Sequence, residues 1–499
     1  MAAGLRQLLL MNPSVFAPDS ANGNSDRRAQ WLLAGLLGLS IVVAFLTKGT
    51  YDSGDSIKHY LYARYAFKYP LNFLDSWAKP LFTLLSAGPA QAGFIGVKLF
   101  QCAVVAGSAW CAYIVARALR LPAPELAILL LYAIPDYFLI QFSGLTEPLF
   151  GLVLVGAVAL LMTGRPGWSA ALISWLPFVR SEGFILIGIW VVYLAWHRQW
   201  RLLPLLVLGY AAYSTVGAVV LGEPGWVFGH NPYATVPTYG HGEWNYFLLR
   251  MPGFLGWVLL GWAVLGGGRM LRDCLRPERR QAPLFSAELL LIYGNITVFI
   301  LAHSVFWAKG LFHSFGLTRV LTVTAPLFAV VVLNGLDWVA TLGRSATVQR
   351  RIRIGGAVAA VVFLFTGARS AFRWQRDFGQ PADQQLAENA AAWVQKTYGP
   401  AGRPLAYEFP YGALALHNDF FDPQTHRVFV LQTGTFLELL PVGPLLVWDD
   451  WFARFEAKVP LAALRADVRF RQRWEGALPR DPHHPEHDSV RLVVFERVR

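Results

Sequence analysis

The residue types and spacing best suited to chemistry lie in residues 51–80, which read YDSGDSIKHYLYARYAFKYPLNFLDSWAKP. This stretch holds Asp52 and Asp55, and His59 follows Asp55 by four residues. If Asp52 or Ser53 caps a helix here, Asp55 and His59 lie one turn apart on the same helix face. A carboxylate in this place could take a proton from a hydroxyl group, so we predict Asp55 as a general base and Asp52 as the alternative. The competing interpretation is a helix lying in a membrane interface, with the acids as caps.

The elements around this stretch are apolar segments long enough to cross a membrane. The chain of 499 residues is 55% hydrophobic and 15% charged, with a mean hydropathy of +0.41, whereas soluble domains carry about 25% charged residues. Because about 20 apolar helical residues span a bilayer, we predict a mainly α polytopic transmembrane helical bundle of about 9–11 spans. The candidate spans are residues 31–46, 94–116, 126–142, 146–163, 168–178, 184–196, 202–221, 254–265, 289–307, 320–336 and 354–366.

The positive residues predict how the spans are oriented. Lys and Arg gather in alternate loops, and loops rich in these residues tend to stay in the cytoplasm. Arg27 and Arg28 precede the first span, and five arginines lie between residues 269 and 280. We therefore predict a cytoplasmic N-terminus, with loop 48–93, loop 222–252 and the C-terminal tail outside the cytoplasm. The net charge of +12 is scattered over short loops, which argues against nucleic acid as a partner.

The composition changes at about residue 371, where charged residues become frequent and apolar runs shorten. We therefore divide the chain into a membrane domain, residues 1–370, and a small soluble extracytoplasmic α/β domain, residues 371–499. The patterns predict a helix over 383–398 and strands over 404–409, 427–431, 444–448 and 490–498. The acids Asp449 and Asp450 follow the third of these strands. We interpret them as helix caps, although an acid pair after a strand can also hold a metal.

A set of short motifs together resembles the GT-C superfamily of integral-membrane glycosyltransferases. The motifs are the acidic loop after the first span, Trp77-Ala78-Lys79-Pro80, Thr146-Glu147-Pro148-Leu149-Phe150, Arg180-Ser181-Glu182-Gly183, and Thr318-Arg319-Val320 leading to Pro326. The resemblance covers roughly residues 31–340 as an architecture, and mannosyltransferase-like members are the nearest match. It implies use of a polyprenyl- or dolichyl-phosphate sugar as the donor.

The resemblance also implies an inverting reaction, in which an acid of the first extracytoplasmic loop deprotonates the acceptor while the lipid phosphate departs. By position Asp55 would be that base. Many members carry two adjacent acids or an Asp-Glu pair there, whereas Ser53 and Gly54 separate Asp52 from Asp55 in this chain. The choice between the two acids therefore stays open.

Positive groups are expected near the departing phosphate, because negative charge develops on it. Arg319 is the first candidate, since it matches the late arginine of the superfamily and lies at the predicted outer end of a span. The competing interpretation is an arginine that snorkels to the interface. Lys79, Lys58 and Arg180 are the next candidates, and Lys79 could equally anchor a surface helix.

Other polar residues are expected to contribute to the same site. Glu147, at the mouth of a span, could accept a hydrogen bond from a sugar hydroxyl, and we place His59 among the substrate-binding residues. Loop 222–252 is rich in Gly, Pro, His and aromatic residues. It could cap a carbohydrate or lipid headgroup by stacking, or form an aromatic belt at the interface. His230, His241 and Glu243 match no compact metal-ligand spacing, so we predict no metal ligands, while a divalent metal stays open because members of the superfamily differ.

These observations favour a multi-pass membrane glycosyltransferase that moves one sugar, with mannose as the candidate, from a polyprenyl-phosphate donor to a lipid-linked or extracytoplasmic acceptor. The bilayer, the donor lipid and a glycan or lipid acceptor would be its partners. One alternative is a secondary transporter or lipid flippase, whose substrate site usually lies at the membrane midplane, often between internal repeats. No repeat is visible here, and the acids collect in loops. The other alternative is a non-enzymatic scaffold for envelope assembly.

Overall fold

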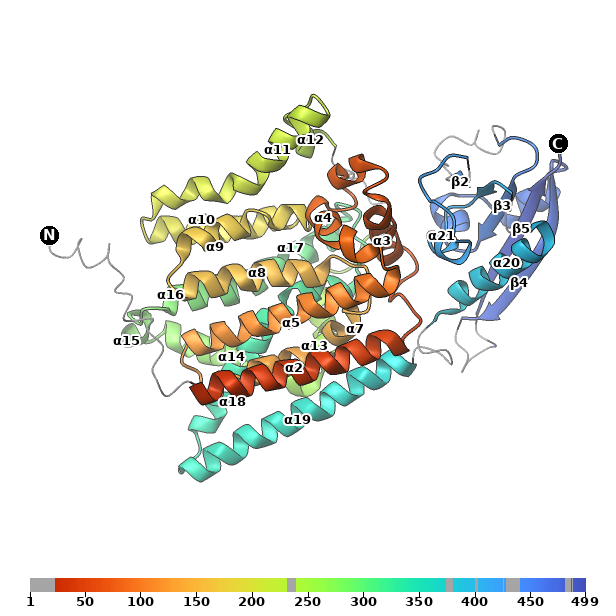
Figure 1. The fold of residues 1–499 in the computed structure, drawn as a ribbon. Coiled ribbons are helices and arrows are strands. Elements are labelled where there is room, and N and C mark those ends of the chain that lie inside the picture. Colours follow the sequence, from red (N-terminus) through yellow and green to blue (C-terminus); the bar gives the residue numbers. More distant parts are fainter. Residues whose placement is uncertain are drawn as a thin grey trace.

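The computed structural model describes residues 23–230, 239–373, 380–399, 403–424, 426–427, 440–480, 486 and 488–499. Long helices lie side by side with their axes roughly aligned, and a smaller sheet with its own helices lies at one end of this bundle (Figure 1). The protein is therefore a mainly helical bundle with a small C-terminal sheet, as the sequence predicts.

The helical part begins at α2 and ends at α19. Its first half contains α2 (Gly23–Leu46), α3 (Asp55–Tyr65), η3 (Pro70–Leu74), α4 (Pro80–Ala90), α5 (Phe94–Ala118), α6 (Leu126–Tyr132), α7 (Pro135–Ile140), α8 (Glu147–Met162), α9 (Pro166–Ile173), η4 (Leu176–Phe178) and α10 (Gly183–Trp196). Its second half contains η5 (Trp200–Val207), α11 (Leu208–Val220), α12 (Trp226–Gly229), α13 (Tyr246–Leu255), α14 (Trp257–Cys274), α15 (Pro277–Arg280), α16 (Phe285–Ala287), η6 (Glu288–Gly294), α17 (Asn295–Lys309), η7 (Thr318–Thr324), α18 (Ala325–Thr341) and α19 (Ala346–Arg373).

Several of these helices are long and apolar enough to cross a membrane. Within the described residues the spans that meet both conditions are Ser25–Leu46, Phe94–Ala118, Trp200–Val220, Phe285–Lys309 and Thr318–Thr341, and the bent pair α13 and α14 adds one more if it is a single span. α8 and α10 are apolar helices of 16 and 14 residues. A chain in hydrocarbon must pair its backbone polar groups internally, which explains why these apolar runs form helices. The chain is therefore a multi-pass membrane protein.

Proline and glycine divide some of the predicted spans. The predicted span 126–142 is formed by two short helices, α6 and α7, because Pro135 at the start of α7 has no N–H to continue α6. α13 and α14 meet at an angle of 117°. Gly256 between them has a φ of 76°, a backbone conformation that side chains with a Cβ rarely adopt. The apolar patterns thus predict the helices but not the places where they bend.

Loop 48–93 lies at the end of the bundle that faces the sheet, where α3, η3 and α4 fold back on one another (Figure 1). The predicted helix after Asp52 is α3, which begins at Asp55. The Asp52 carboxylate accepts hydrogen bonds from the amides of Gly54 (2.9 Å) and Ser56 (3.0 Å), and so holds the first turn. Pro80 is the first residue of α4, a position at which the missing proline N–H costs nothing.

The C-terminal part is a five-stranded sheet with strand order β2-β1-β3-β5-β4. Its strands and helices are α20 (Ala382–Tyr398), β1 (Leu405–Ala406), α21 (Tyr411–Ala415), β2 (His426–Arg427), β3 (Leu445–Asp449), η9 (Phe452–Glu456), α23 (Leu461–Ala466), β4 (Phe470–Pro479) and β5 (Ser489–Arg497). β1 is parallel to β2 and β3, and β5 is antiparallel to β3 and β4. α20 packs against β4 and β5.

The sequence predicts most of this part. The predicted helix over 383–398 corresponds to α20, and the predicted strands over 404–409, 444–448 and 490–498 overlap β1, β3 and β5. Most of the predicted strand 427–431 lies outside the described residues. β4 was not predicted, because its sequence FRQRWEGALP is mostly exposed and too polar to resemble a buried strand.

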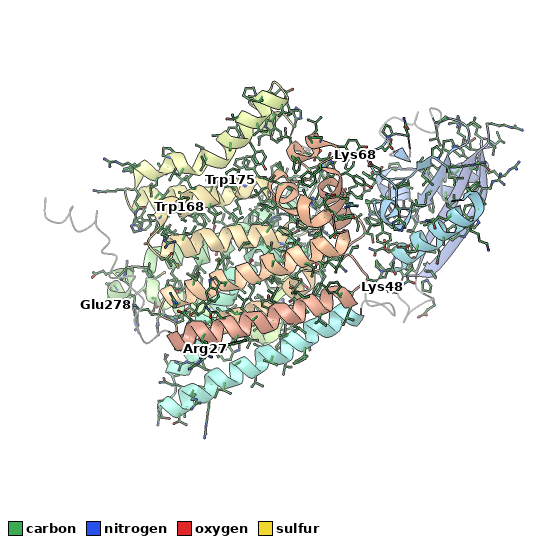
Figure 2. All side chains as sticks on the ribbon, in the orientation of Figure 1. Arg27, Lys48, Lys68, Trp168, Trp175 and Glu278 are labelled. Atoms are coloured by element: carbon green, nitrogen blue, oxygen red, sulfur yellow. The ribbon has the colours of Figure 1, made fainter. Side chains whose placement is uncertain are left out.

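The two ends of the bundle differ in what they carry. Arg27 and Glu278 lie at one end, and Lys48 and Lys68 lie at the other, next to the sheet (Figure 2). The arginines of α14 and α15 therefore lie at the end of the bundle opposite loop 48–93. This arrangement agrees with the predicted orientation, in which the end with Arg27 is cytoplasmic, but the side of the membrane that each end faces stays a prediction.

Candidate active site

The centre of the site is an arginine held between two aspartates. Arg319 lies on η7, just before α18, and its side chain is only 12% exposed. One of its terminal nitrogens pairs with Asp52 and the other with Asp55. The pairs join positions that are more than 260 residues apart in the chain. The structure therefore brings together three of the residues singled out by the sequence.

A buried carboxylate lies behind this arginine. Glu147, in the first turn of α8, is fully buried, and its Oε1 lies 2.8 Å from Arg180 Nη1 and 3.5 Å from Arg319 Nε. A carboxylate in such a place is strongly destabilising unless cations compensate its charge. Arg180 also pairs with Glu182 Oε1 at 2.9 Å. His303 Nε2 lies 3.6 Å from the same Glu182 oxygen.

The two aspartates differ in environment. Burial raises the pKa of Asp52 to about 6 against the opposing effect of Arg319. Burial also acts to raise the pKa of Asp55, but Arg319 and other neighbouring groups outweigh it, so that this pKa lies below its usual value. The Asp55 side chain is 45% exposed and that of Asp52 is 25% exposed. Asp55 is therefore the more accessible of the two acids, whereas the Asp52 carboxylate also accepts hydrogen bonds from the amides of Gly54 and Ser56.

Lys79 and His59 lie beside this cluster. Lys79 is buried, donates a hydrogen bond to the Ser76 carbonyl at 3.1 Å, and has Glu182, Arg180 and Asp55 among its charged neighbours. Burial lowers the pKa of Lys79 to about 8. Because Lys79 carries its charge below that pH, it adds a positive charge to the side of the site that Arg180 occupies.

His59 is buried, and its ring stacks on Trp77 with centroids 4.9 Å apart. Its Nδ1 lies 3.2 Å from the Ala78 carbonyl oxygen. Burial lowers the pKa of His59 to about 3, so the ring is neutral at physiological pH. His59 therefore packs the loop beside Lys79 and contributes no charge to the site.

Lys58 pairs with an acid of the C-terminal part. Its Nζ lies 3.6 Å from Glu408 Oε1 and 5.7 Å from the centre of the Trp77 ring. Burial raises the pKa of Glu408 to about 7, and Lys58 opposes this shift. Lys58 thus links the loop to Glu408 of the C-terminal part and also acts electrostatically on Asp55.

Loop 222–252 reaches the catalytic end at two described points. The Ser76 hydroxyl donates a hydrogen bond to the His230 carbonyl, and His230 Nε2 lies 2.9 Å from Glu223 Oε2. Tyr239 contacts Phe315 edge to face, with ring centroids 4.9 Å apart. Residues 231–238 lie outside the described residues, so a cap formed by this loop stays a prediction.

The described residues include no group of three or more His, Cys, Asp or Glu side chains arranged to hold a metal ion. Asp449 acts as a cap, as predicted, because its carboxylate accepts hydrogen bonds from the amides of Trp451, Phe452 and Ala453 at 2.6–3.2 Å. Asp450 accepts a hydrogen bond from the Arg491 amide at 3.1 Å. Both carboxylates of this pair therefore accept hydrogen bonds from backbone amides of the C-terminal part.

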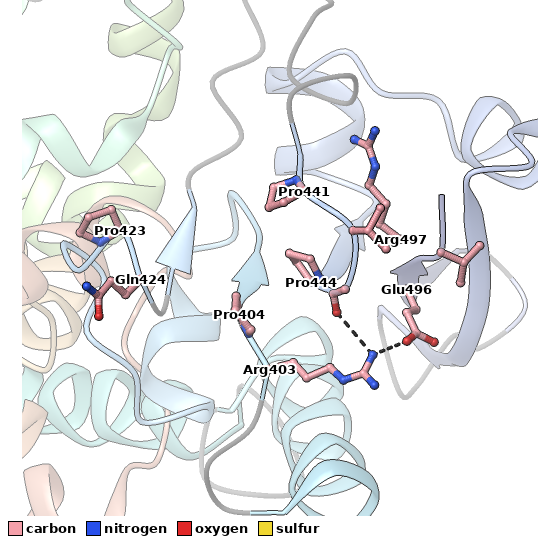
Figure 3. A pocket seen from close by; sticks show the side chains of 11 residues that line it. Arg403, Pro404, Pro423, Gln424, Pro441, Pro444, Glu496 and Arg497 are labelled. Carbon is pink, nitrogen blue, oxygen red and sulfur yellow. Dashed lines mark hydrogen bonds and ion pairs between the residues drawn. The ribbon is translucent and has the colours of Figure 1, made fainter.

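A pocket of the C-terminal sheet lies away from this cluster (Figure 3). Arg403 crosses it, pairing with Glu496 and donating to the Gly443 carbonyl at 3.4 Å. The pocket includes Pro444, which directly precedes the first residue of β3. Phe452, which contacts Gly54 of loop 48–93, lies just after the last residue of β3. The pocket and Asp55 thus lie at opposite ends of this strand.

No pattern in the sequence predicts which residues of the C-terminal part face loop 48–93. Glu408 lies beside Lys58, and Gln384 of α20 donates hydrogen bonds to Thr50 and Ser53. Gln384 is fully buried, which is unusual for glutamine. In the sequence Gln384 belongs to an Ala-, Gln- and Glu-rich helix and resembles an ordinary surface residue. Its contacts with Thr50 and Ser53 are therefore visible only in the folded structure.

Comparison with solved structures identifies the fold. The chain superposes on ArnT from Cupriavidus metallidurans bound to undecaprenyl phosphate with a TM-score of 0.63, at 14% identity, over 93% of this chain and 97% of that one. For ArnT from the same organism in the apo state the TM-score is 0.57, at 13% identity, over 95% and 98%. No family model and no curated protein matches the sequence. At this identity the likeness concerns the fold, and it confirms the predicted mainly helical membrane bundle as an ArnT-like fold.

Proposed function

We propose that the protein is a membrane glycosyltransferase that transfers a sugar from a polyprenyl-phosphate donor to an acceptor hydroxyl. The observation that carries this proposal is Arg319 between Asp52 and Asp55, at one end of a bundle with the fold of ArnT. ArnT has been solved with undecaprenyl phosphate bound. A lipid phosphate is therefore the donor group that this fold and these cations suit best.

In the proposed reaction Asp55 takes the proton of an acceptor hydroxyl. The acceptor oxygen forms a bond to the anomeric carbon while the bond from that carbon to the lipid phosphate oxygen breaks, so the configuration inverts. The electron pair of the broken bond leaves with the phosphate, where cations stabilise it. Asp55 suits the part of the base because it is ionised and the more exposed of the two acids.

Lys79, Arg180 and Arg319 are the proposed partners of the phosphate. In the present arrangement each already has acidic neighbours: Glu182 for Lys79 and Arg180, and Asp52 and Asp55 for Arg319. A bound phosphate would compete with these carboxylates for the cations. Glu147 is proposed to hold Arg180 and Arg319 in place from the buried side, since it lies between them.

The finer parts of the proposal concern substrate and orientation. Mannose stays the proposed sugar, and the acceptor is proposed to be lipid-linked or extracytoplasmic. We also propose that the N-terminus lies in the cytoplasm, so that loop 48–93 and the C-terminal α/β domain, residues 371–499, lie outside it. The arginines between residues 269 and 280 support this orientation, because they lie at the end of the bundle opposite the site.

A transfer assay with purified protein tests the proposal. Wild-type protein should move labelled mannose from undecaprenyl-phosphate mannose to a lipid or glycan acceptor, and D55N should lower kcat by about 100- to 10,000-fold, the usual contribution of a general base. A matched control is D26N. Asp26 lies at the other end of the bundle, where its Oδ1 is 2.5 Å from Arg117 Nη1, and the substitution removes this carboxylate.

D26N is expected to keep wild-type transfer. If D55N and D52N both transfer sugar at the wild-type rate, the assignment of the base is wrong. If no polyprenyl-phosphate sugar supports transfer by the wild-type protein, the proposed function is wrong, and movement of intact lipid between leaflets should then be measured.

A further inference from the structure

One buried side chain of the C-terminal part lies directly against the catalytic loop. Gln384, in the first turn of α20, is fully buried, and its Nε2 donates hydrogen bonds to Thr50 Oγ1 at 2.7 Å and Ser53 Oγ at 3.0 Å. These two acceptors flank Asp52 in the sequence, and Ser53 lies two residues before Asp55. Because a buried amide is costly unless it is hydrogen-bonded, the contact constrains both of its partners.

The loop passes this constraint on through its own hydrogen bonds. Thr50 Oγ1 donates to the Asp52 carbonyl at 2.7 Å, and Ser56 Oγ donates to the Thr50 carbonyl at 2.6 Å. The amide of Gly144, from the membrane part, donates to Ser56 Oγ at 2.7 Å. Loop 50–56 is therefore held from two sides, by Gly144 of the bundle and by Gln384 of the C-terminal part.

A second contact presses on the same loop between the two aspartates. The ring of Phe452 packs on Gly54, where a Cβ would lie 3.2 Å from Phe452 Cζ. Phe452 is itself fixed, because its amide donates to Asp449 at 2.6 Å and its ring stacks on Phe409 with centroids 5.6 Å apart. The Phe452 ring therefore restricts movement of the loop backbone at Gly54 toward the C-terminal part.

The C-terminal part also holds the far end of α3. The Tyr65 hydroxyl, in the last turn of this helix, donates to the Asn418 carbonyl at 3.1 Å. Lys68, just beyond the helix, pairs with Asp419 at 2.7 Å. The helix that begins at Asp55 is thus contacted by the same neighbouring part before its first residue and at its last turn.

We propose that the C-terminal α/β part positions the catalytic loop, and that Gln384 is the positioning residue that keeps Asp55 directed at Arg319 and the acceptor. Gln384 acts through Thr50 and Ser53 and touches no reacting atom. Misplacement of a catalytic group by about 1 Å can lower a rate about 100-fold, so a contact of this kind is sufficient to control the reaction. The kinetic consequence rests on the proposed function, whereas the effect on the loop does not.

The variant Q384M tests the role in catalysis, because methionine has a similar length but no amide donor. In the full-length protein in detergent we expect kcat for sugar transfer to fall roughly 10- to 100-fold while the KM for the donor lipid stays within about twofold. Q395M, which changes the same residue type at an exposed position of α20, should leave both parameters unchanged. T50V should lower kcat, and T50S, which keeps the hydroxyl, should retain it.

Hydrogen–deuterium exchange gives a readout that needs no substrate. We expect Q384M to raise exchange in the peptide that covers residues 48–56, and Q395M to leave it unchanged. Wild-type kcat and unchanged loop exchange in Q384M would overturn the proposal, as would increased exchange throughout the protein, which would indicate a general structural role. If the wild-type protein transfers no sugar but only the loop peptide exchanges faster in Q384M, the proposed function fails and the positioning contact stands.

Discussion

The two ends of the helical bundle both contain buried charges, but they use them differently. At the end with the arginine-rich loop, Arg269 donates to Asn334 at 2.8 Å, and Asn334 donates to Glu288 at 2.9 Å. Arg353 pairs with Asp337 at 3.0 Å. These residues lie on α14, η6, α18 and α19, so the network ties neighbouring helices together.

At the end with the candidate site one cation is shared. Arg319 pairs with both Asp52 and Asp55 and lies close to Glu147, while Asp55 remains 45% exposed. The side chain of Asp337 at the other end is 13% exposed. A closed network stabilises the fold, whereas an exposed and ionised acid next to a shared cation is available to a substrate. The comparison therefore distinguishes a buried network at one end from the more exposed proposed site at the other.

The largest expected effect comes from removing the shared cation with R319M. Asp52 and Asp55 then lose their common partner, and Glu147 keeps only Arg180. Loss of one partner from a buried ion pair typically costs about 3–5 kcal/mol. We expect both loss of sugar transfer and a clear fall in the thermal unfolding temperature in detergent.

R353M is the matched change at the other end. Arg353 is partly exposed, and Asp337 keeps Arg269 at 4.0 Å, so we expect a loss of about 1 kcal/mol or less and unchanged transfer. Equal losses of stability in R319M and R353M, with transfer retained in both, would remove the distinction between the two ends.

A smaller effect is expected from the titration of Lys79. Burial lowers its pKa to about 8, so Lys79 is charged below that pH and loses its charge above it. If Lys79 binds the donor phosphate, the KM for the donor should rise roughly tenfold between pH 7 and pH 9, in proportion to the loss of the charged form. K79R keeps its charge over this range and should abolish the rise.

Donor KM measured against pH for both proteins is the required measurement. K68R is a control, since Lys68 pairs with Asp419 outside the Arg319 cluster, and it should follow the wild-type curve. A rise in KM that persists unchanged in K79R would exclude Lys79 as its source.

Local patterns account for most of the fold that the sequence predicted. Apolar runs such as that of α8 must form helices in a bilayer, and the Val-, Leu- and Phe-rich run of β5 indicates a strand. The break at Pro135 and the 117° bend at Gly256 were not predicted, because the direction of a chain after a bend depends on the helices packed against it. β4 was missed because its sequence is polar and largely exposed, and it is a strand through its pairing with β5.

Residues of the candidate site could be predicted only where they belong to one of the motifs quoted for the resemblance. The resemblance singled out Asp55, Arg319 and Glu147, which the structure brings together. The resemblance could not decide which of Asp52 and Asp55 is the better candidate base. Their difference in exposure and pKa arises from contacts with η7 and from the hydrogen bonds of Asp52 at the start of α3. Gln384 could not be predicted, since it reaches Thr50 across 334 residues through the docking of the C-terminal part.

The smallest effect on transfer is expected from N334L, which acts on the stabilising end alone. Asn334 is fully buried and links Arg269 to Glu288. Leucine fills a similar volume but leaves both groups without this partner, which should cost about 1–3 kcal/mol of stability. A lower thermal unfolding temperature with kcat and donor KM unchanged is the expected result. If N334L instead lowers kcat while the fold stays intact, the two ends are coupled through α18, since this helix carries Asn334 and directly follows the segment that carries Arg319.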